Sequence, residues 1–227
     1  MGRGLRRIAA QLEKAVLRLR LGERWRPADD TLSRRVYPDY ATYLAHQSLK
    51  LDAHRASSLA AHDRRFASAL GERLGASGLP LSGRTVLCLA ARSGAEVRAF
   101  REHGAAAVGI DLNPGPDNPW VVRGDFHALA HRDGSVDLIY MNSLDHVFDL
   151  DALVREIRRV LREDGIFLAE IGPGTDEGGA PGFYEALTWR TADALVERIA
   201  AAGFREEMRT PFHVPWEGVQ SVLRKRR

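Results

Sequence analysis

Three acidic side chains and one histidine follow short apolar segments of the chain. Asp111 closes the apolar run 106–111, Asp125 comes soon after a second run, and Asp145 and His146 come soon after a third. A carboxylate can accept hydrogen bonds from two neighbouring hydroxyl groups at once, as in a ribose, and histidine is the natural proton acceptor near neutral pH. We therefore expect a site that holds a ribose-bearing ligand beside a group that can take up a proton.

The segments that carry these residues alternate between strand and helix patterns. The clearest helix is predicted over 149–161, where Asp149 can cap the first turn and apolar residues recur at helical spacing. A last helix is expected over 191–202 and ends at Gly203. The expected strands are 84–89, 106–111, 121–127, 135–142, 165–171, 204–214 and 219–224.

Strands that alternate with helices form a mostly parallel sheet with helices on both faces, so the pattern predicts an α/β fold. Ligands of such open sheets lie outside the carboxyl ends of the strands. That rule brings together the turn 90–94, Asp111, Asp125 with Phe126, and the segment 142–146. Residues far apart in the sequence are thereby predicted to share one site.

The order and spacing of these segments over residues 80–227 resemble those of the class I S-adenosylmethionine-dependent methyltransferases. In that family a glycine-rich turn follows the first strand, an acid ends the second, and an Asp follows the third. Gly94, Asp111 and Asp125 stand at those places. The resemblance implies a doubly wound, mostly parallel, seven-stranded Rossmann-like sheet with a reversed C-terminal hairpin, and S-adenosyl-L-methionine as the cofactor.

The resemblance also implies a role for each residue at this edge of the sheet. Asp111 would hold the ribose, Asp125 would accept from the adenine amino group, and Leu112 or Phe126 would flank the adenine ring. Each acid has a structural alternative, because Asp111 can form a turn with the residues after it and Asp125 can cap its own turn. The remaining expected cofactor-binding residues are Ala90, Ala91, Arg92, Gly94 and Asn142.

The first turn departs from the family pattern of three glycines, since only Gly94 remains and Ala90 and Arg92 occupy the other two places. Glycine at such places allows a close approach of the backbone to the ligand and a positive φ. Arg92 can pair with the carboxylate of the cofactor's methionine part, or lie on the surface beside Glu96, four residues along the helix. A third alternative is a pocket that binds nothing.

His146 is the candidate general base. Asp145 can orient it only if the segment forms a turn, because adjacent residues of a helix do not face each other. A structural histidine is the alternative, and Glu170 is a second candidate base. The histidines 127, 131 and 146 do not form a spaced ligand set with nearby acids, so no metal site is predicted. No phosphate-binding loop of the G-x-x-x-x-G-K-[ST] type and no serine nucleophile elbow is found in the sequence.

The composition is typical of a globular protein with ordinary charge. The chain has 227 residues, of which 44% are hydrophobic and 28% charged. We expect a sheet domain over 80–227 preceded by an N-terminal helical extension over 1–79, with the Gly, Ser and Pro residues of 75–83 between them. No apolar run is long enough to span a bilayer, and the single cysteine, Cys88, excludes an internal disulfide. A cytoplasmic location is consistent with these features.

The positive charge is concentrated before the sheet domain. Residues 1–35 contain ten Lys and Arg against four Asp and Glu, an excess of six, whereas the whole chain has a net charge of +3. Apolar residues at helical spacing over 5–19 predict a basic amphipathic helix, which can pack on its own domain or on a second copy, or bind an anionic membrane surface, a partner protein or nucleic acid. The segment 26–30 is interpreted as a linker, and helices are expected over 40–74.

These expectations combine into an S-adenosylmethionine-dependent methyltransferase that acts on a small-molecule or membrane-associated acceptor, with O-methylation favoured by His146. Two alternatives stay open. The basic N-terminus favours a nucleic-acid methyltransferase, and the departure of the first turn favours a binding or scaffold protein that keeps the fold without catalysis.

Overall fold

The computed structural model describes residues 12, 15–16, 24–52, 56–115 and 117–226. Its main sheet has seven strands in the order β5-β4-β3-β6-β7-β10-β9, in which β10 runs antiparallel to both of its neighbours and the others are parallel. This topology confirms the predicted doubly wound sheet with a reversed C-terminal hairpin. The strands are β3 (Thr85–Leu89), β4 (Ala106–Asp111), β5 (Val121–Arg123), β6 (Val136–Met141), β7 (Leu161–Ile171), β9 (Phe204–Phe212) and β10 (Gly218–Lys225).

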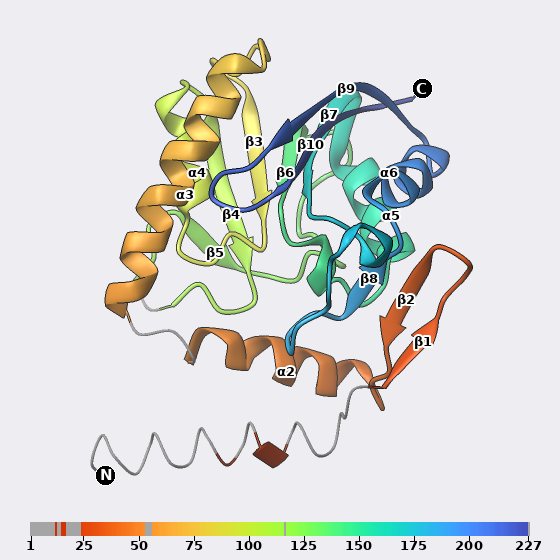
Figure 1. The fold of residues 1–227 in the computed structure, drawn as a ribbon. Coiled ribbons are helices and arrows are strands. Elements are labelled where there is room, and N and C mark those ends of the chain that lie inside the picture. The colour runs from red at the N-terminus through yellow and green to blue at the C-terminus, as the bar shows by residue number, and fades with distance from the viewer. Residues whose placement is uncertain (1–11, 13–14, 17–23, 53–55, 116, 227) are drawn as a thin grey trace.

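Helices cover both faces of this sheet, and the alternation of side chains along each strand feeds two separate hydrophobic cores. In β3, Val86 and Cys88 face the side of α3 (Ala56–Ala76) and α4 (Ala95–Glu102), whereas Leu87 and Leu89 face the side of α5 (Leu150–Val160) and α6 (Ala192–Ala201). Figure 1 shows the two helix pairs on opposite sides of the sheet.

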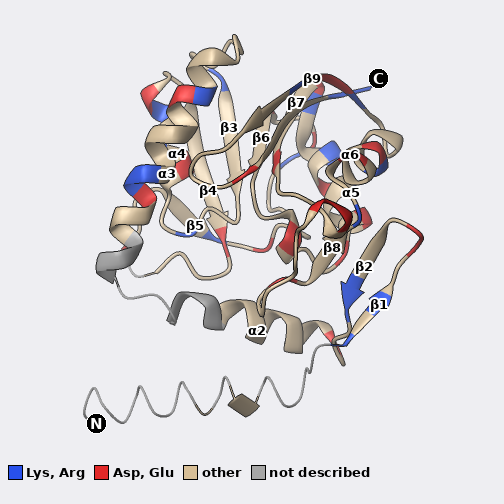
Figure 2. Ribbon diagram, viewed as in Figure 1, with Lys and Arg blue, Asp and Glu red and all other residues tan. Residues whose placement is uncertain are grey.

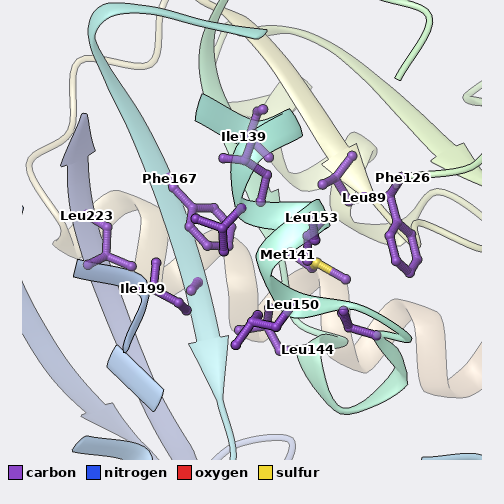
Figure 3. Close-up of a cluster of buried hydrophobic side chains, with 14 of the residues drawn as sticks. Leu89, Phe126, Ile139, Met141, Leu144, Leu150, Leu153, Phe167, Ile199 and Leu223 are labelled. Atoms are coloured by element: carbon purple, nitrogen blue, oxygen red, sulfur yellow. The ribbon is translucent and has the colours of Figure 1, made fainter. Parts of the chain in front are cut away.

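The core on the side of α5 and α6 is the larger of the two and includes the helix that was clearest in the sequence. The cap residue Asp149 accepts a hydrogen bond from the Ala152 amide at 3.0 Å, so the predicted start of α5 is confirmed. Figure 3 shows Leu89, Ile139 and Phe167 of the sheet in one cluster with Leu150 and Leu153 of α5 and Ile199 of α6.

The helix α2 (Tyr40–Asp52) crosses the carboxyl end of the sheet and closes it from below in Figure 1. Asp39 caps it by accepting a hydrogen bond from the Thr42 amide at 2.7 Å. The Tyr43 hydroxyl donates to the carbonyl of His146 at 2.9 Å, so this helix is fixed to the segment that carries the candidate base. The prediction of two helices over 40–74 is confirmed by α2 and α3.

The interpretation of residues 26–30 as a linker was wrong. They belong to a hairpin of β1 (Trp25–Pro27) and β2 (Leu32–Arg35), which joins β8 (Leu187–Trp189) in a second, antiparallel sheet of order β1-β2-β8. The Asp29 carboxylate closes the hairpin turn by accepting from the amides of Thr31 and Leu32. Strands of three and four residues give no periodic signal, and β8 lies more than 150 residues away in the sequence.

The basic amphipathic helix expected over 5–19 lies outside the described residues, except for positions 12, 15 and 16, whose side chains are exposed. The described part of the basic N-terminal segment includes arginines on β1 and β2, which are blue in Figure 2. Within the described part of the chain, no helix combines the length and the apolar character needed to cross a membrane.

Candidate functional site

A cavity of about 490 Å³ lies at the carboxyl end of the sheet, where the topology predicts a ligand site. It extends from the first turn and the end of β4 to the segment after β6 and to the loops after β7 and β9. The expected site residues that line it are Ala90, Arg92, Asp111, Leu112, Phe126, Asn142, Asp145 and His146. The structure therefore brings eight of the eleven expected residues to one cavity.

The first turn keeps a glycine-like backbone although two of its three expected glycines are absent. Ala90, Arg92 and Gly94 all have positive φ, of 56°, 43° and 84°. Holding a residue other than glycine in this conformation costs about 1–2 kcal/mol. The turn is therefore strained at Ala90 and Arg92. Strain that is kept at the edge of a ligand cavity indicates that the conformation of this turn matters for binding.

Two expected members of the turn contribute by packing rather than by lining the cavity. Ala91 is buried, and its Cβ would lie 2.7 Å from a Cβ added to Gly109 on β4. A Cβ on Gly94 would lie 2.7 Å from the Cβ of Trp120. Both glycines therefore allow the turn and its neighbouring segments to approach closely.

Asp111 connects the end of β4 to the first turn. Its Oδ2 accepts from the Arg92 amide at 2.9 Å, and its Oδ1 accepts from the Asn113 amide at 2.8 Å. Each oxygen keeps a second lone pair for a ligand hydroxyl. The turn-forming role and the ligand-binding role considered from the sequence are thus compatible in one side chain.

The alternative that Arg92 lies on the surface beside Glu96 was wrong, because its side chain faces α3 instead. The Nη2 of Arg92 donates to Oδ1 of Asp63 at 3.2 Å, and the Ser93 hydroxyl donates to Oδ2 of the same carboxylate. Asp63 is 5% exposed. Asp63 of α3 therefore supplies the counter-charge for Arg92 in the first turn. No local sequence pattern predicts this contact.

Glu96 lies in the first turn of α4 and lines the cavity, although it is only 8% exposed. Burial, with smaller contributions from Asp63 and Asp111, raises the pKa of Glu96 to about 7, while its own backbone amide and Arg92 act in the opposite direction. The Asn142 side-chain amide lies 3.5 Å from its Oε1. A glutamate of this kind changes its protonation near neutral pH, next to the first turn.

We expect Glu96 to make stability depend on pH. Its folded-state pKa of about 7 exceeds the ordinary value of 4.5, so its contribution is fully present below pH 4.5 and is lost as the pH rises through 7. Relative to a Glu96→Gln variant, the free energy of unfolding of the wild type should fall by roughly 3 kcal/mol between pH 4.5 and 8. Urea unfolding at several pH values measures this difference.

A Glu102→Gln variant, at the exposed end of the same helix, is the matched control and should follow the wild type at every pH. Parallel curves for the wild type and Glu96→Gln across this range would show that Glu96 titrates as an ordinary exposed glutamate.

Asp125 does not line the cavity, because its carboxylate is engaged by other residues. Oδ1 accepts from the His127 amide at 2.9 Å, and the Tyr40 hydroxyl of α2 donates to Oδ2. Burial raises the pKa of Asp125, but hydrogen bonds from His127 and Tyr40 outweigh it and hold the pKa below its usual value. The neighbouring Phe126 does line the cavity, so in this segment the ring faces the ligand space while the acid anchors α2.

His146 is buried at 8% exposure in a short 3-10 helix, Leu144–His146, which satisfies the requirement for a tight turn. Its Nδ1 lies 3.0 Å from the carbonyl oxygen of Tyr184, and since a carbonyl only accepts, Nδ1 carries the proton. Nε2 is then the basic nitrogen, 3.6 Å from Oδ2 of Asp145. The side chains of Asp145, His146 and Glu185 converge, with one ligand atom of each within 4.8 Å of the others.

Glu170, the second candidate base, is part of a buried network instead. Its carboxylate accepts from Arg73 at 2.8 and 3.1 Å, from the Tyr140 hydroxyl at 2.7 Å and from the Gln220 amide at 2.9 Å. Arg73 also donates to the carbonyl of Val214, near the start of the loop that brings Trp216 to the cavity. With four donors on its two oxygens, this carboxylate is suited to holding structure together.

Sequence reasoning missed the part of the cavity that comes from outside the sheet strands. Gln47 of α2, Asp63 and Phe66 of α3, Glu185 and Trp216 all line it. Gln47, Asp63 and Phe66 lie in the helical stretch expected over 40–74, but the helical pattern alone does not show which of its side chains line a cavity. Glu185 and Trp216 lie outside the predicted helices and strands, so no pattern placed them at the cavity.

Residues 87–169 match the family model described as a methyltransferase domain. The match begins in β3 and ends in β7, and so includes the first turn, Asp111, Asp125 and His146. Over these residues the chain carries a methyltransferase domain similar to that of the class I S-adenosylmethionine-dependent methyltransferases. The matched domain and the shared fold indicate an S-adenosylmethionine-dependent methyltransferase.

Solved structures of methyltransferases share the fold at low sequence identity. A Burkholderia thailandensis 1,6-didemethyltoxoflavin-N1-methyltransferase, solved with 1,6-didemethyltoxoflavin and S-adenosylhomocysteine, is 19% identical with a TM-score of 0.65; the match covers 89% of this chain and 99% of that one. A chain in the complex of a Haloferax volcanii methyltransferase activator with a methyltransferase is 18% identical with a TM-score of 0.60, covering 80% and 97%. A comparison with curated protein sequences finds no match.

Proposed function

We propose that this methyltransferase transfers a methyl group to a hydroxyl of a small aromatic or heteroaromatic acceptor. The observation that carries the proposal is the position of His146, which lines the cavity with Nδ1 3.0 Å from the Tyr184 carbonyl oxygen and Nε2 3.6 Å from Oδ2 of Asp145. Phe66, Trp189 and Trp216 line the same cavity and offer surfaces on which a planar acceptor can stack. The similar Burkholderia enzyme was solved with 1,6-didemethyltoxoflavin bound in addition to S-adenosylhomocysteine.

The cofactor-binding roles follow from the residues around the first turn. Asp111 would accept from the ribose hydroxyls, and Phe126 and Leu112 would flank the adenine. Arg92 would hold the carboxylate of the methionine part, while Asp63 fixes the guanidinium in place. Asp125 would act indirectly, by keeping α2 and Phe126 in position. Ala90, Ala91 and Gly94 shape the turn, and Asn142 lies between it and the acceptor side.

Bound S-adenosylmethionine supplies an electrophilic methyl group on a sulfonium. The protein then has to align the acceptor oxygen and remove its proton. His146 would take up that proton at Nε2, and Asp145 would stabilise the resulting imidazolium. Tyr184 holds the ring from the other side through its carbonyl, so the ring orientation is fixed before the acceptor binds.

The same cavity argues against a nucleic-acid acceptor. A polyanion would have to enter a space lined by Asp111, Asp145 and Glu185, and like charges at close range are unfavourable. Residues 1–35 carry an excess of six positive charges, which would favour binding to an anionic membrane surface, a partner protein or a second copy of the chain. Binding of the full chain to anionic and neutral lipid vesicles tests the membrane alternative.

A His146→Gln variant tests the proposed base. Glutamine keeps the size of the side chain but cannot take up the proton, so kcat should fall about 100-fold, near the lower limit for general bases because alignment supplies much of the rate. The assay is the transfer of labelled methyl groups from S-adenosylmethionine to phenols and hydroxylated nitrogen heterocycles. The affinity for S-adenosylhomocysteine, measured by calorimetry, should stay within about twofold of the wild type.

Methyl transfer to ring nitrogens of the same heterocycles, at equal rates in wild type and His146→Gln, would replace O-methylation with N-methylation and remove the role of His146. Absence of S-adenosylhomocysteine binding in the wild type would contradict the placement of the cofactor in this cavity.

A further inference from the structure

The cavity carries an excess of acidic groups. Among the described residues, one arginine, Arg92, lines it, against six carboxylates. Those carboxylates are Asp63, Glu96, Asp111, Asp145, Glu170 and Glu185. The charge of a cavity selects the charge of its ligands. A ligand group with the same sign of charge as the cavity loses its hydration and is also repelled.

Most of these carboxylates are balanced within the protein or by the cofactor. Asp63 pairs with Arg92, and Glu170 pairs with Arg73. The pKa of Glu96 is raised to about 7, first by burial, so this group is partly neutral. Asp111 accepts two backbone hydrogen bonds and has the ribose as its proposed ligand. The two that remain are Asp145 and Glu185, on the acceptor side.

Within the described part of the chain, no ion pair is seen between the Glu185 carboxylate and a Lys or Arg side chain. Its Oε2 is buried without a hydrogen-bond partner, although the residue lines the cavity. Arg35 lies close by, where its Nε donates to the carbonyl of Glu185 at 2.8 Å and its Nη2 donates to that of Gly182 at 2.9 Å. A buried, charged oxygen without a donor is costly, and a ligand that supplies the donor removes this cost.

The backbone around Glu185 is held in place, so its carboxylate is presented from a fixed position. The Ala186 amide donates to the carbonyl of Asp145 at 2.7 Å, which ties the two acidic residues together. The Arg35 amide donates to the carbonyl of Ala186 at 2.8 Å, which ties the same segment to β2. Preorganised acceptors of this kind bind a matching donor with little loss of conformational entropy.

We propose that the acceptor enters as a cation, with an N–H-bearing group such as an amidinium, a guanidinium or a protonated ring amine directed at Glu185 and Asp145. The inference rests on the proposed function, since it concerns the acceptor half of the same cavity. Charged N–H donors match carboxylates in geometry as well as in charge. Trp189 and Trp216 provide aromatic faces that favour a planar cation. Anionic acceptors are excluded by the same two carboxylates.

A divalent metal ion is the other cation that Asp145, His146 and Glu185 could take. The organic cation fits the surroundings better, because the cavity extends well beyond these three residues and has aromatic walls, whereas a bare ion needs a closely packed polar shell. The two cations give different results in one experiment.

The test uses benzamidinium as the probe, with benzoate and neutral benzamide for comparison, on the full chain saturated with S-adenosylhomocysteine. We expect calorimetry to show binding of benzamidinium at least about 10-fold tighter than that of benzamide, and no binding of benzoate. Glu185→Gln should weaken benzamidinium about 10-fold or more, because one charge-assisted contact is replaced by a neutral one. Glu197→Gln, at an exposed position of α6, is the matched control and should not change it.

Equal binding of the three probes, or binding of benzamidinium that is unchanged in Glu185→Gln, would overturn the proposal. Displacement of benzamidinium by Mn²⁺, with Mn²⁺ binding lost in both Asp145→Asn and Glu185→Gln, would overturn it in favour of a metal site. S-adenosylhomocysteine binding is recorded in every sample, so a failure of the proposed function is seen as its loss, separately from the response to the probes.

Discussion

An Asp111→Ala variant is expected to bind S-adenosylhomocysteine at least about 100-fold more weakly than the wild type. The carboxylate at the end of β4 would accept both ribose hydroxyls, and each charge-assisted hydrogen bond contributes about 1.5–3 kcal/mol. Asp111 also holds the Arg92 amide, so its loss releases one corner of a turn that is strained at Ala90 and Arg92. The two effects act in the same direction. Calorimetric titration with S-adenosylhomocysteine measures the sum.

The control is Asp117→Asn, which removes a carboxylate from an exposed position six residues further along. Its affinity should stay within about twofold of the wild type. Thermal unfolding of both variants separates binding from stability, because the loss of two backbone contacts at Asp111 should cost about 1–3 kcal/mol without unfolding the protein. An Asp111→Ala variant that binds as tightly as the wild type would show that the acid serves only the turn.

The positions of the parallel strands could be predicted because each strand is a local, apolar segment. Residues 85–89 and 106–111 are continuous apolar runs, and the helix after Asp149 has a regular apolar face. Once these elements are placed in order, the rule for open α/β sheets brings Asp111, Phe126 and His146 to one edge without any knowledge of side-chain contacts. The fold and the location of the site were therefore accessible from the sequence.

The contacts that complete the site were not accessible, because they join segments that no local pattern relates. Asp63 reaches Arg92 across 29 positions, and Glu185 reaches the His146 segment across about 40. The first turn, residues 90–94, is a further example of a conformation that the residue types did not predict. Its missing glycines raised the alternative of a pocket that binds nothing, yet the structure shows a positive φ at both substituted positions. Backbone conformation there is set by the surrounding contacts rather than by the residue type.

The hairpin β1–β2 was missed for a similar reason. Its pairing with β8 depends on a segment that follows the Gly-rich loop 174–179, and strands this short have no alternation to detect. The glycine content of that loop by itself predicts enough flexibility for a lid. The loop contains a 3-10 turn, Thr175–Glu177, in which the Glu177 carboxylate accepts from the Gly174 amide at 2.7 Å and from the Ala192 amide at 2.8 Å. These contacts attach the loop to the start of α6.

A Glu170→Leu variant is expected to lose about 3–5 kcal/mol of the free energy of unfolding, because the buried charge of Arg73 would be left without its partner. Glu170 is 1% exposed, and its carboxylate is the common acceptor for Arg73, Tyr140 and Gln220. Burial already raises the pKa of Tyr140 well above its usual value, so its hydroxyl cannot ionise to replace Glu170 as the negative partner of Arg73. Urea unfolding followed by circular dichroism measures the loss.

The comparison variant is Glu163→Leu, at an exposed position of the same strand, which should change the free energy of unfolding by less than about 0.5 kcal/mol. A double variant, Glu170→Leu with Arg73→Leu, separates the two possible origins of the effect. If the unpaired guanidinium is responsible, removing it should recover most of the loss, since a buried ion pair can be replaced by apolar groups at little cost. If the double variant is as unstable as Glu170→Leu alone, the hydrogen bonds of Tyr140 and Gln220 carry the stability instead. In either case the network is structural, so Glu170 is removed as a candidate base and His146 stays the proposed one.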